Sequence, residues 1–200
     1  MSRTGSELDL GELLARCRRG DDLAWEALVR RFQARVYGLA FHYVRHAEEA
    51  RDLAQEIFVR VYRKLDTFRE EETFLPWMLR LGRNVCIDHL RRAKARPPAT
   101  DLTIGEDMFL ADTAPTPEAA WMADSRKRLV HRALQMLSEP YREMILLKEI
   151  QGLPLEEIAS MLNLPLGTVK SRSSRARVEL AHAVLALDAG GSEGRGAGSS

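Results

Sequence analysis

The side chains best suited to bind a charged partner lie on a predicted helix near the carboxyl end of the chain. Residues three, four and seven apart share one face of a helix, and the face opposite Val169, Ala176 and Leu180 is cationic and short-chained. Its members are Lys170, Ser171, Ser174, Arg175 and Arg177. Such a face can hold phosphates and hydrogen-bond base edges, which favours a DNA ligand. The simpler alternative is a surface helix with solvated charges.

A turn and a shorter helix precede this face. Apolar residues have helical spacing over residues 155–162, and the pattern stops at Asn163. Asparagine tolerates the left-handed backbone that a tight turn needs, and Pro165 can open the next helix, where no amide donor is missed. Two helices joined in this way form a helix-turn-helix, whose second helix enters the major groove with its first turn nearest the bases. That first turn also offers Thr168.

A second cationic helix is predicted from near Thr73 to Arg92. Its polar positions carry several arginines and one asparagine, and two more cations follow. Asp88 is the single acidic residue in this span. They are Arg80, Arg83, Asn84, Arg91 and Arg92, then Lys94 and Arg96. These charges would repel one another without an anionic partner. The preceding loop holds Phe68, which either plugs the core or offers a ring on which an unpaired base can stack.

A polar stripe occupies another predicted helix, residues 47–65. Its members repeat at three and four residues on the side opposite Leu53 and Ile57. They are Asp52, Gln55, Glu56 and the exposed Val59. By composition alone, a solvated face is the simplest interpretation.

Helical periodicity runs through the chain and no alternating strand pattern occurs, so we expect an all-α protein of two small helical domains. Residues 8–96 are predicted to form a four-helix bundle and residues 125–187 a helix-turn-helix domain. Residues 97–124 contain four prolines and no helical period, which predicts a flexible acidic linker. The Gly- and Ser-rich residues 188–200 are expected to be a disordered tail.

Local signals predict where several helices begin and end. Gly20 ends the first helix, and Asp21 or Asp22 can cap the second. In the second domain, one helix ends before Pro140 and the next is closed by Gly152. The apolar positions expected inside these two helices are Leu129, Ala133, Met136 and Leu137, then Tyr141, Ile145, Leu146 and Ile150.

The charges divide the chain into the same parts. Residues 1–96 hold 19 basic and 15 acidic side chains. Residues 97–124 hold six acidic side chains and no basic one, and residues 125–200 hold 11 basic and eight acidic side chains. Two net-basic blocks beside an acidic linker suggest a nucleic-acid partner better than the net charge of +1 does.

Other classes of protein find little support. Cys17 and Cys86 are far apart and resemble small buried apolar residues, so neither a disulfide framework nor a thiolate metal site is expected. His42 and His46 could begin a metal site, but no third ligand stands at usable spacing. We therefore expect no metal, no cofactor and no enzymatic activity. No signal peptide or membrane-spanning segment is evident, which predicts a cytoplasmic protein without membrane insertion.

Three segments in this order resemble the sigma subunits of bacterial RNA polymerase. They are residues 52–58 (DLAQEIF), 74–92 (FLPWMLRLGRNVCIDHLRR) and 164–177 (LPLGTVKSRSSRAR). The similarity is strongest to the short extracytoplasmic-function class of the sigma-70 family and spans roughly residues 10–187. It implies a sigma region 2 type domain, a region 4 type domain and a role in transcription initiation. The alternative is a helix-turn-helix regulator that binds duplex DNA without the polymerase, but such a protein would need a sensor or phosphoacceptor domain.

The resemblance assigns a role to each surface. It implies that the stripe Asp52, Gln55, Glu56 and Val59 docks on the clamp coiled coil of the polymerase largest subunit, with the flap as a further polymerase contact. Phe68 and Asn84 match the pocket for a base flipped from the minus-ten element, and Arg80, Arg83, Arg91 and Arg92 would hold backbone phosphates. The residues expected to read the minus-thirty-five element are Thr168, Lys170, Ser171, Ser174, Arg175 and Arg177. The class also implies an anti-sigma partner that responds to stress.

Three positions depart from the family pattern. Pro154 replaces a capping serine, so the first helix of the helix-turn-helix is expected to lack a side-chain cap. Ser173 stands where an apolar residue commonly packs inward. His46 replaces an acidic or small residue before the helix that carries the polar stripe.

Overall fold

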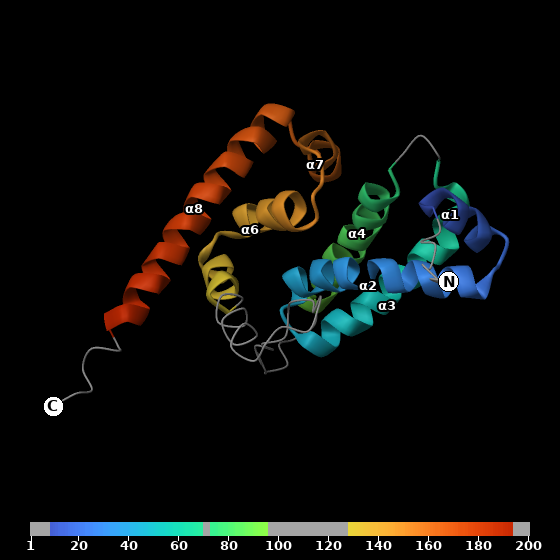
Figure 1. Ribbon diagram of the computed structural model, residues 1–200, viewed down its shortest axis with the longest axis horizontal. Helices are drawn as coiled ribbons and strands as arrows, with labels where there is room; N and C mark the ends of the chain where they lie inside the picture. The colour runs from blue at the N-terminus through green and yellow to red at the C-terminus, as the bar shows by residue number, and fades with distance from the viewer. Residues whose placement is uncertain (1–8, 70–72, 96–127, 194–200) are drawn as a thin grey trace, which may run out of the picture. The chain divides into compact units, whose positions relative to one another are not determined.

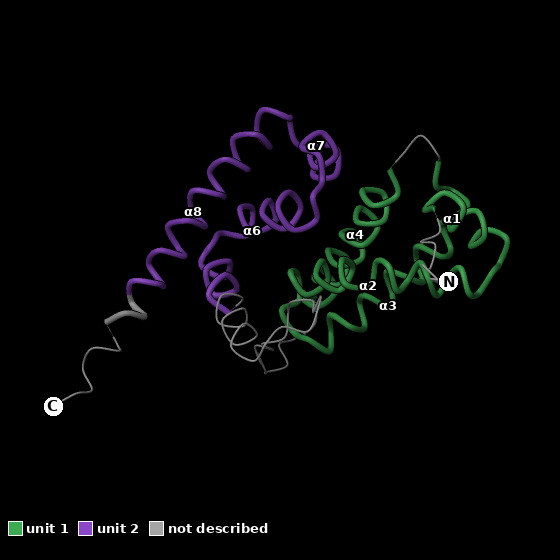
Figure 2. Tube along the Cα trace, in the orientation of Figure 1, with its two compact units in different colours: residues 1–108 green, residues 109–200 purple. Residues whose placement is uncertain are grey.

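The computed structural model describes residues 9–69, 73–95 and 128–193 (Figure 1). The chain divides into two compact units, residues 1–108 and residues 109–200 (Figure 2). Every regular element among the described residues is helical, which confirms the predicted all-α fold with two helical domains. The predicted linker, residues 97–124, lies outside the described residues, so the expected domain boundaries stay predictions.

Among its described residues, the first unit contains four α-helices and one short 3₁₀ turn. They are α1 (Leu10–Arg18), α2 (Asp22–Val44), α3 (Ala47–Lys64), the turn η1 (Leu65–Thr67) and α4 (Phe74–Lys94). Leu39 of α2, Ile57 of α3 and Met78 of α4 are fully buried, so the three long helices share one core. At Gly82 an added Cβ would lie 2.8 Å from Leu39 Cδ2 and 3.3 Å from Ile57 Cδ1. The missing side chain therefore allows α4 to approach α2 and α3 closely.

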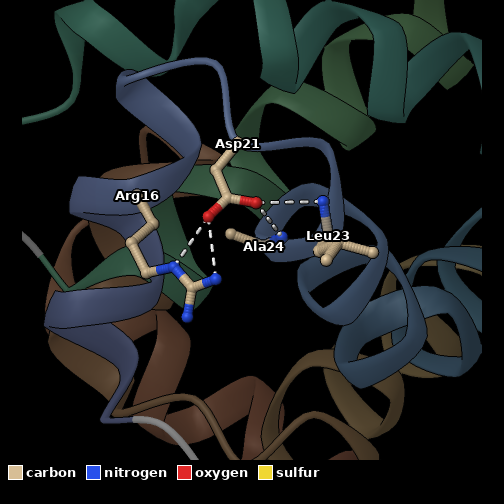
Figure 3. Close-up of polar contacts among 4 residues, drawn as sticks. All are labelled: Arg16, Asp21, Leu23 and Ala24. Atoms are coloured by element: carbon tan, nitrogen blue, oxygen red, sulfur yellow. Dashed lines mark hydrogen bonds and ion pairs between the residues drawn. The ribbon is translucent and has the colours of Figure 1, made fainter.

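The corner between α1 and α2 is built by a glycine and an aspartate, and Figure 3 shows the contacts of the aspartate. Gly20 has φ +78°, which reverses the chain, and Asp21 then caps α2 by accepting hydrogen bonds from the amides of Leu23 and Ala24, both at 3.1 Å. Arg16 Nε donates to the same carboxylate at 2.8 Å. The Ala24 amide, followed by Arg16, lowers the pKa of the Asp21 carboxyl. Of the two predicted caps, Asp21 is therefore the correct one.

His46 serves as the N-cap of α3. Its Nδ1 accepts a hydrogen bond from the Glu49 amide at 3.5 Å, while Arg45 before it adopts the left-handed conformation, φ 54°. The histidine that departs from the family pattern thus takes the place of a shorter capping side chain. Thr73, near which the sequence predicts this helix to begin, is the N-cap residue of α4 but makes no side-chain cap hydrogen bond.

In the described part of the second unit, a helical stretch at residues 128–136 is followed by three further helices and a π-helical turn. They are α6 (Glu139–Ile145), the turn η2 (Leu146–Ile150), α7 (Leu155–Leu162) and α8 (Leu166–Glu193). Gly152, with φ +73°, follows η2 and closes the helix formed by α6 and η2, as predicted. Two predicted core residues are wrong, because Met136 is 60% exposed and Ile150 is 41% exposed.

A π-helical turn explains the error at Ile150, and side-chain packing explains the error at Met136. Leu134 and Leu147 are buried in their place. The wider π-helical turn at Leu146–Ile150 rotates the following residues away from the face that a regular helix would present. At residues 128–136, Ala133 and Leu137 are buried as predicted, and Leu134, three residues before Leu137, takes the buried position expected for Met136.

The helix α8 is longer than predicted. It continues through Glu193, so the expectation of a structureless tail from residue 188 is wrong for residues 188–193. Once a helix is nucleated, each added residue gains a backbone hydrogen bond without a new nucleation cost, which outweighs the weak propensity of the glycines. Residues 194–200 lie outside the described part of the chain.

Candidate nucleic-acid interfaces

The turn between α7 and α8 has the predicted helix-turn-helix geometry. Asn163 adopts the left-handed conformation, φ 53° and ψ 50°, and ends α7. The Pro165 carbonyl accepts hydrogen bonds from the amides of Thr168 and Val169 at 2.9 and 3.1 Å, which starts α8. Pro154 precedes α7 without a side-chain cap, as its residue type predicts. The second helix is thus held by backbone geometry at the turn and by its buried side.

The two sides of α8 separate as the spacing predicts. Val169, Ser173 and Ala176 are buried against the rest of the unit. The predicted groove-facing set is exposed except for Thr168, which is partly covered: Lys170, Ser171, Ser174, Arg175 and Arg177. The Ser171 hydroxyl donates to the Thr168 carbonyl at 3.0 Å, so its proton is already engaged. The sequence interpretation missed Val178, which is 52% exposed and, four residues after Ser174, belongs to the same side.

The cationic residues of α4 do not form a single group. Asn84 is four residues after Arg80 and seven before Arg91, so these three form a row along the helix. Asn84 and Arg91 are exposed, and Arg91 Nη1 lies 3.9 Å from an Asp88 carboxylate oxygen. Arg83 lies beside this row and is half-buried, as is Arg80.

Arg92 turns toward α3 instead. Its Nη2 lies 3.9 Å from Glu56 Oε1, and its Nε donates to the Asp88 carbonyl at 3.3 Å. Glu56 Oε1 also accepts from Arg60 Nη2 at 3.4 Å. The structure therefore divides the predicted phosphate-binding arginines into those in the row and one that is paired with an acid of the neighbouring helix.

Phe68 lies in the core rather than on the surface. Phe68 is only 7% exposed. Its ring centre lies 5.1 Å from that of Trp77 and 5.5 Å from that of Phe74. Of the two roles that the sequence left open, the structure shows the core plug. A covered ring has no free face for a base, so Asn84 is the exposed member of the predicted base-binding pair.

The polar stripe of α3 is a mixed surface. Asp52 and Gln55 are exposed, Glu56 is half-exposed in its ion pairs, and Val59 is 48% exposed. The stripe continues into Tyr62, which the sequence interpretation missed. Tyr62 is 51% exposed, and its ring also packs edge-on against Trp25 with the ring centres 5.0 Å apart. An exposed valine and tyrosine beside acids resemble the mixed surfaces of protein interfaces.

Other kinds of site are not evident in the described ranges. No three His, Cys, Asp or Glu side chains there gather where they could hold a metal ion, and no described helix is long and apolar enough to cross a membrane. Both cysteines are buried. Burial raises the pKa of the Cys86 thiol to about 12, which keeps it protonated and unreactive at neutral pH.

Comparisons with known proteins identify both units. Residues 28–96 match the family model of Sigma-70 region 2, and residues 127–180 match that of Sigma-70 region 4. The RNA polymerase sigma-H factor of Pseudomonas aeruginosa is 37% identical over 181 residues, covering 88% of this chain and 94% of that protein. The ECF RNA polymerase sigma-E factor of Escherichia coli K12 is 34% identical over 180 residues, with the same coverage.

Solved structures share the fold. The structure of CnrH in complex with the cytosolic domain of CnrY has a TM-score of 0.60 and 26% identity, covering 88% of this chain and 96% of CnrH. The sigma factor RpoE of Bartonella quintana, solved with the anti-sigma factor NepR, has a TM-score of 0.61 and 21% identity, covering 80% and 95%. Because both family models match in the order that the sequence segments predict, and the relatives align over most of their length, the chain belongs to the sigma-70 family of RNA polymerase sigma factors, in its extracytoplasmic-function class.

Proposed function

We propose that this sigma factor binds core RNA polymerase in the cytoplasm, brings it to promoters through α8, and stabilises strand opening through α4. The observation that carries the proposal is that each of the two units presents a cationic helix face of different chemistry. The chain itself performs no chemical reaction in this role and needs no cofactor, because all three tasks are binding tasks.

The α8 face suits duplex DNA. An α-helix fits the major groove, and Lys170 and Arg175 can donate to guanine edges or phosphates while short hydroxyl side chains let the helix approach. Ser174 lies between them, and Val178 adds an apolar group of the kind that contacts thymine methyls. This side of α8 is therefore proposed to read the minus-thirty-five element.

The α4 row suits a strand that has left the duplex. The Asn84 amide can both donate and accept, as the edge of an unpaired base requires, and Arg91 can hold a phosphate on the same side. Arg80 and Arg83 extend the positive potential along the helix. Phe68 supports this face from the core instead of stacking on the base.

The α3 stripe is proposed to bind the polymerase. Asp52 and Gln55 supply acceptors for a basic partner, and Val59 supplies a small apolar contact at the carboxyl-terminal end of the stripe. The second unit is proposed to reach the polymerase flap. A masking protein partner of anti-sigma type is proposed as well, because the similar CnrH is solved in complex with the cytosolic domain of CnrY.

The test is selection from a promoter library with randomised sequence. Core polymerase mixed with the chain should enrich fragments that share two separated sequence elements, and permanganate should modify thymines in the downstream one. Core polymerase alone should enrich none. If the chain without polymerase selects duplex sites with equal preference, the proposal is wrong and the regulator alternative is correct.

A further inference from the structure

An arginine of α1 is bonded to the segment that precedes α4. Arg18 Nη2 donates to the Phe68 carbonyl at 2.8 Å, and its Nε donates to the Leu65 carbonyl at 3.4 Å. Its guanidinium carbon also lies 5.8 Å from the centre of the Phe68 ring. One planar side chain therefore holds both the backbone and the ring of this segment, which a lysine could not do with a single ammonium group.

The helix that carries Arg18 is itself firmly placed. Leu14 and Cys17 are buried in the unit, and Arg16 pairs with the capping Asp21 at 2.8 Å (Figure 3). Because α1 is held both by its buried side chains and by this ion pair, the fold fixes the place from which the Arg18 side chain extends.

Phe68, which Arg18 contacts, packs against α4 near the row. Phe68 covers Trp77, and Trp77 precedes Arg80 by three residues and Asn84 by seven. Residues at this spacing share one side of a helix, so the Phe68 and Trp77 rings lie at the amino-terminal end of the row that includes Asn84. Any displacement of Phe68 would change the shape of that end.

We propose that Arg18 is a positioning residue for promoter opening: it fixes Phe68 against Trp77 and so shapes one end of the face that captures the displaced strand. This inference rests on the function proposed for α4. It concerns a helix outside residues 28–96, the part of the first unit that matches the family model. The match to that model therefore gives Arg18 no role.

The experiment uses the full chain with core polymerase and the promoter fragment that the wild-type holoenzyme selects. It compares Arg18→Ala with Arg19→Ala, which removes the same charge from the exposed neighbouring position at the end of α1. Arg18→Ala should reduce permanganate reactivity by about tenfold, the factor that corresponds to one hydrogen bond from a charged donor. Its affinity for core polymerase should remain that of the wild type. Arg18→Lys should recover part of the opening, because it keeps a charged donor.

The outcomes separate the two proposals. If the wild-type holoenzyme selects no fragment, the proposed function itself is wrong. If the wild type opens the fragment but Arg18→Ala opens it as well as Arg19→Ala, the positioning role is wrong. The positioning role is equally wrong if Arg18→Ala loses core affinity by the same factor as opening, because a general loss of folding would produce that result.

Discussion

At the scale of single residues, neighbouring side chains of one type have different partners. Arg91 and Arg92 are adjacent in sequence, yet Arg91 stays in the row with Asn84 while Arg92 lies beside Glu56 of α3. Arg91 lies 3.9 Å from one Asp88 carboxylate oxygen, whereas Arg92 lies 3.9 Å from Glu56 Oε1 and also donates to the Asp88 carbonyl at 3.3 Å. A guanidinium near two acceptors gains less from a phosphate than one near a single acceptor, because more of its charge is already compensated.

We therefore expect unequal effects of removing these two arginines. Arg91→Ala should reduce the slope of log affinity against log salt concentration, for holoenzyme binding to promoter DNA, by about one, the value for one lost phosphate contact. Arg92→Ala should reduce this slope less. The measurement is the slope of log affinity against log salt concentration for each variant. Equal slopes for the two variants would contradict the division seen in the structure.

Asp21 gives a prediction about pH. The pKa of its carboxyl is lowered from 3.8, first by the Ala24 amide and then by Arg16, so the folded state favours the ionised form more than the unfolded chain does. The resulting stabilisation is present above pH 3.8 and is lost as the pH falls through the lowered pKa of the folded state.

Asp21→Asn tests this prediction, because asparagine can accept the cap hydrogen bonds but does not titrate. The difference in the free energy of urea unfolding between wild type and variant should be largest near neutral pH and should shrink in acid below pH 3.8. A difference that stays constant over this range would show that ionisation of Asp21 contributes nothing.

At the scale of elements, close packing of α4 depends on the absence of a side chain. The Cβ of Gly82→Ala would meet two fully buried side chains, Leu39 and Ile57, at 2.8 and 3.3 Å. Gly38, inside α2, has no heavy atom within 4 Å of its added Cβ and serves as a matched control.

The two glycine variants should change stability in opposite directions. Gly82→Ala should lower the free energy of unfolding by about 1 to 3 kcal/mol through overpacking. Gly38→Ala should raise it by up to about 1 kcal/mol, since alanine is the better helix former. Chemical denaturation followed by circular dichroism measures both. Stabilisation by both substitutions would mean that α4 does not depend on its close approach.

At the scale of the whole molecule, the proposed function divides promoter recognition between two helical units. The first carries the α4 row with Asn84, and the second carries the α8 face with Arg175. Because these residues belong to different units, removing each should affect a different step, and the free-energy effects of the two substitutions should be additive.

Arg175→Ala should weaken discrimination between the selected promoter and a version altered in its upstream element by about 1 to 3 kcal/mol. Asn84→Ala should leave that discrimination intact and reduce permanganate reactivity in the downstream element. Competition binding and permanganate footprinting of the same holoenzymes separate the two effects. The division would be refuted if each variant impaired both steps equally.

Local chemistry in the sequence determined the helices and several of their ends, although not the carboxyl-terminal end of α8. The left-handed turn at Asn163, the reversal at Gly20 and the buried side of α8 all follow from residue type and helical spacing, which act over a few neighbouring positions. For the same reason, the sequence located the cationic faces of α4 and α8.

Only the tertiary structure decided which of several allowed partners each side chain takes. Leu134 rather than Met136 enters the core, Phe68 covers Trp77, and Arg92 meets Glu56, because packing and ion pairing between helices depend on register and distance that sequence spacing does not contain. The link from Arg18 to Phe68 spans 50 positions along the chain. Such contacts exist only once the helices have been brought together.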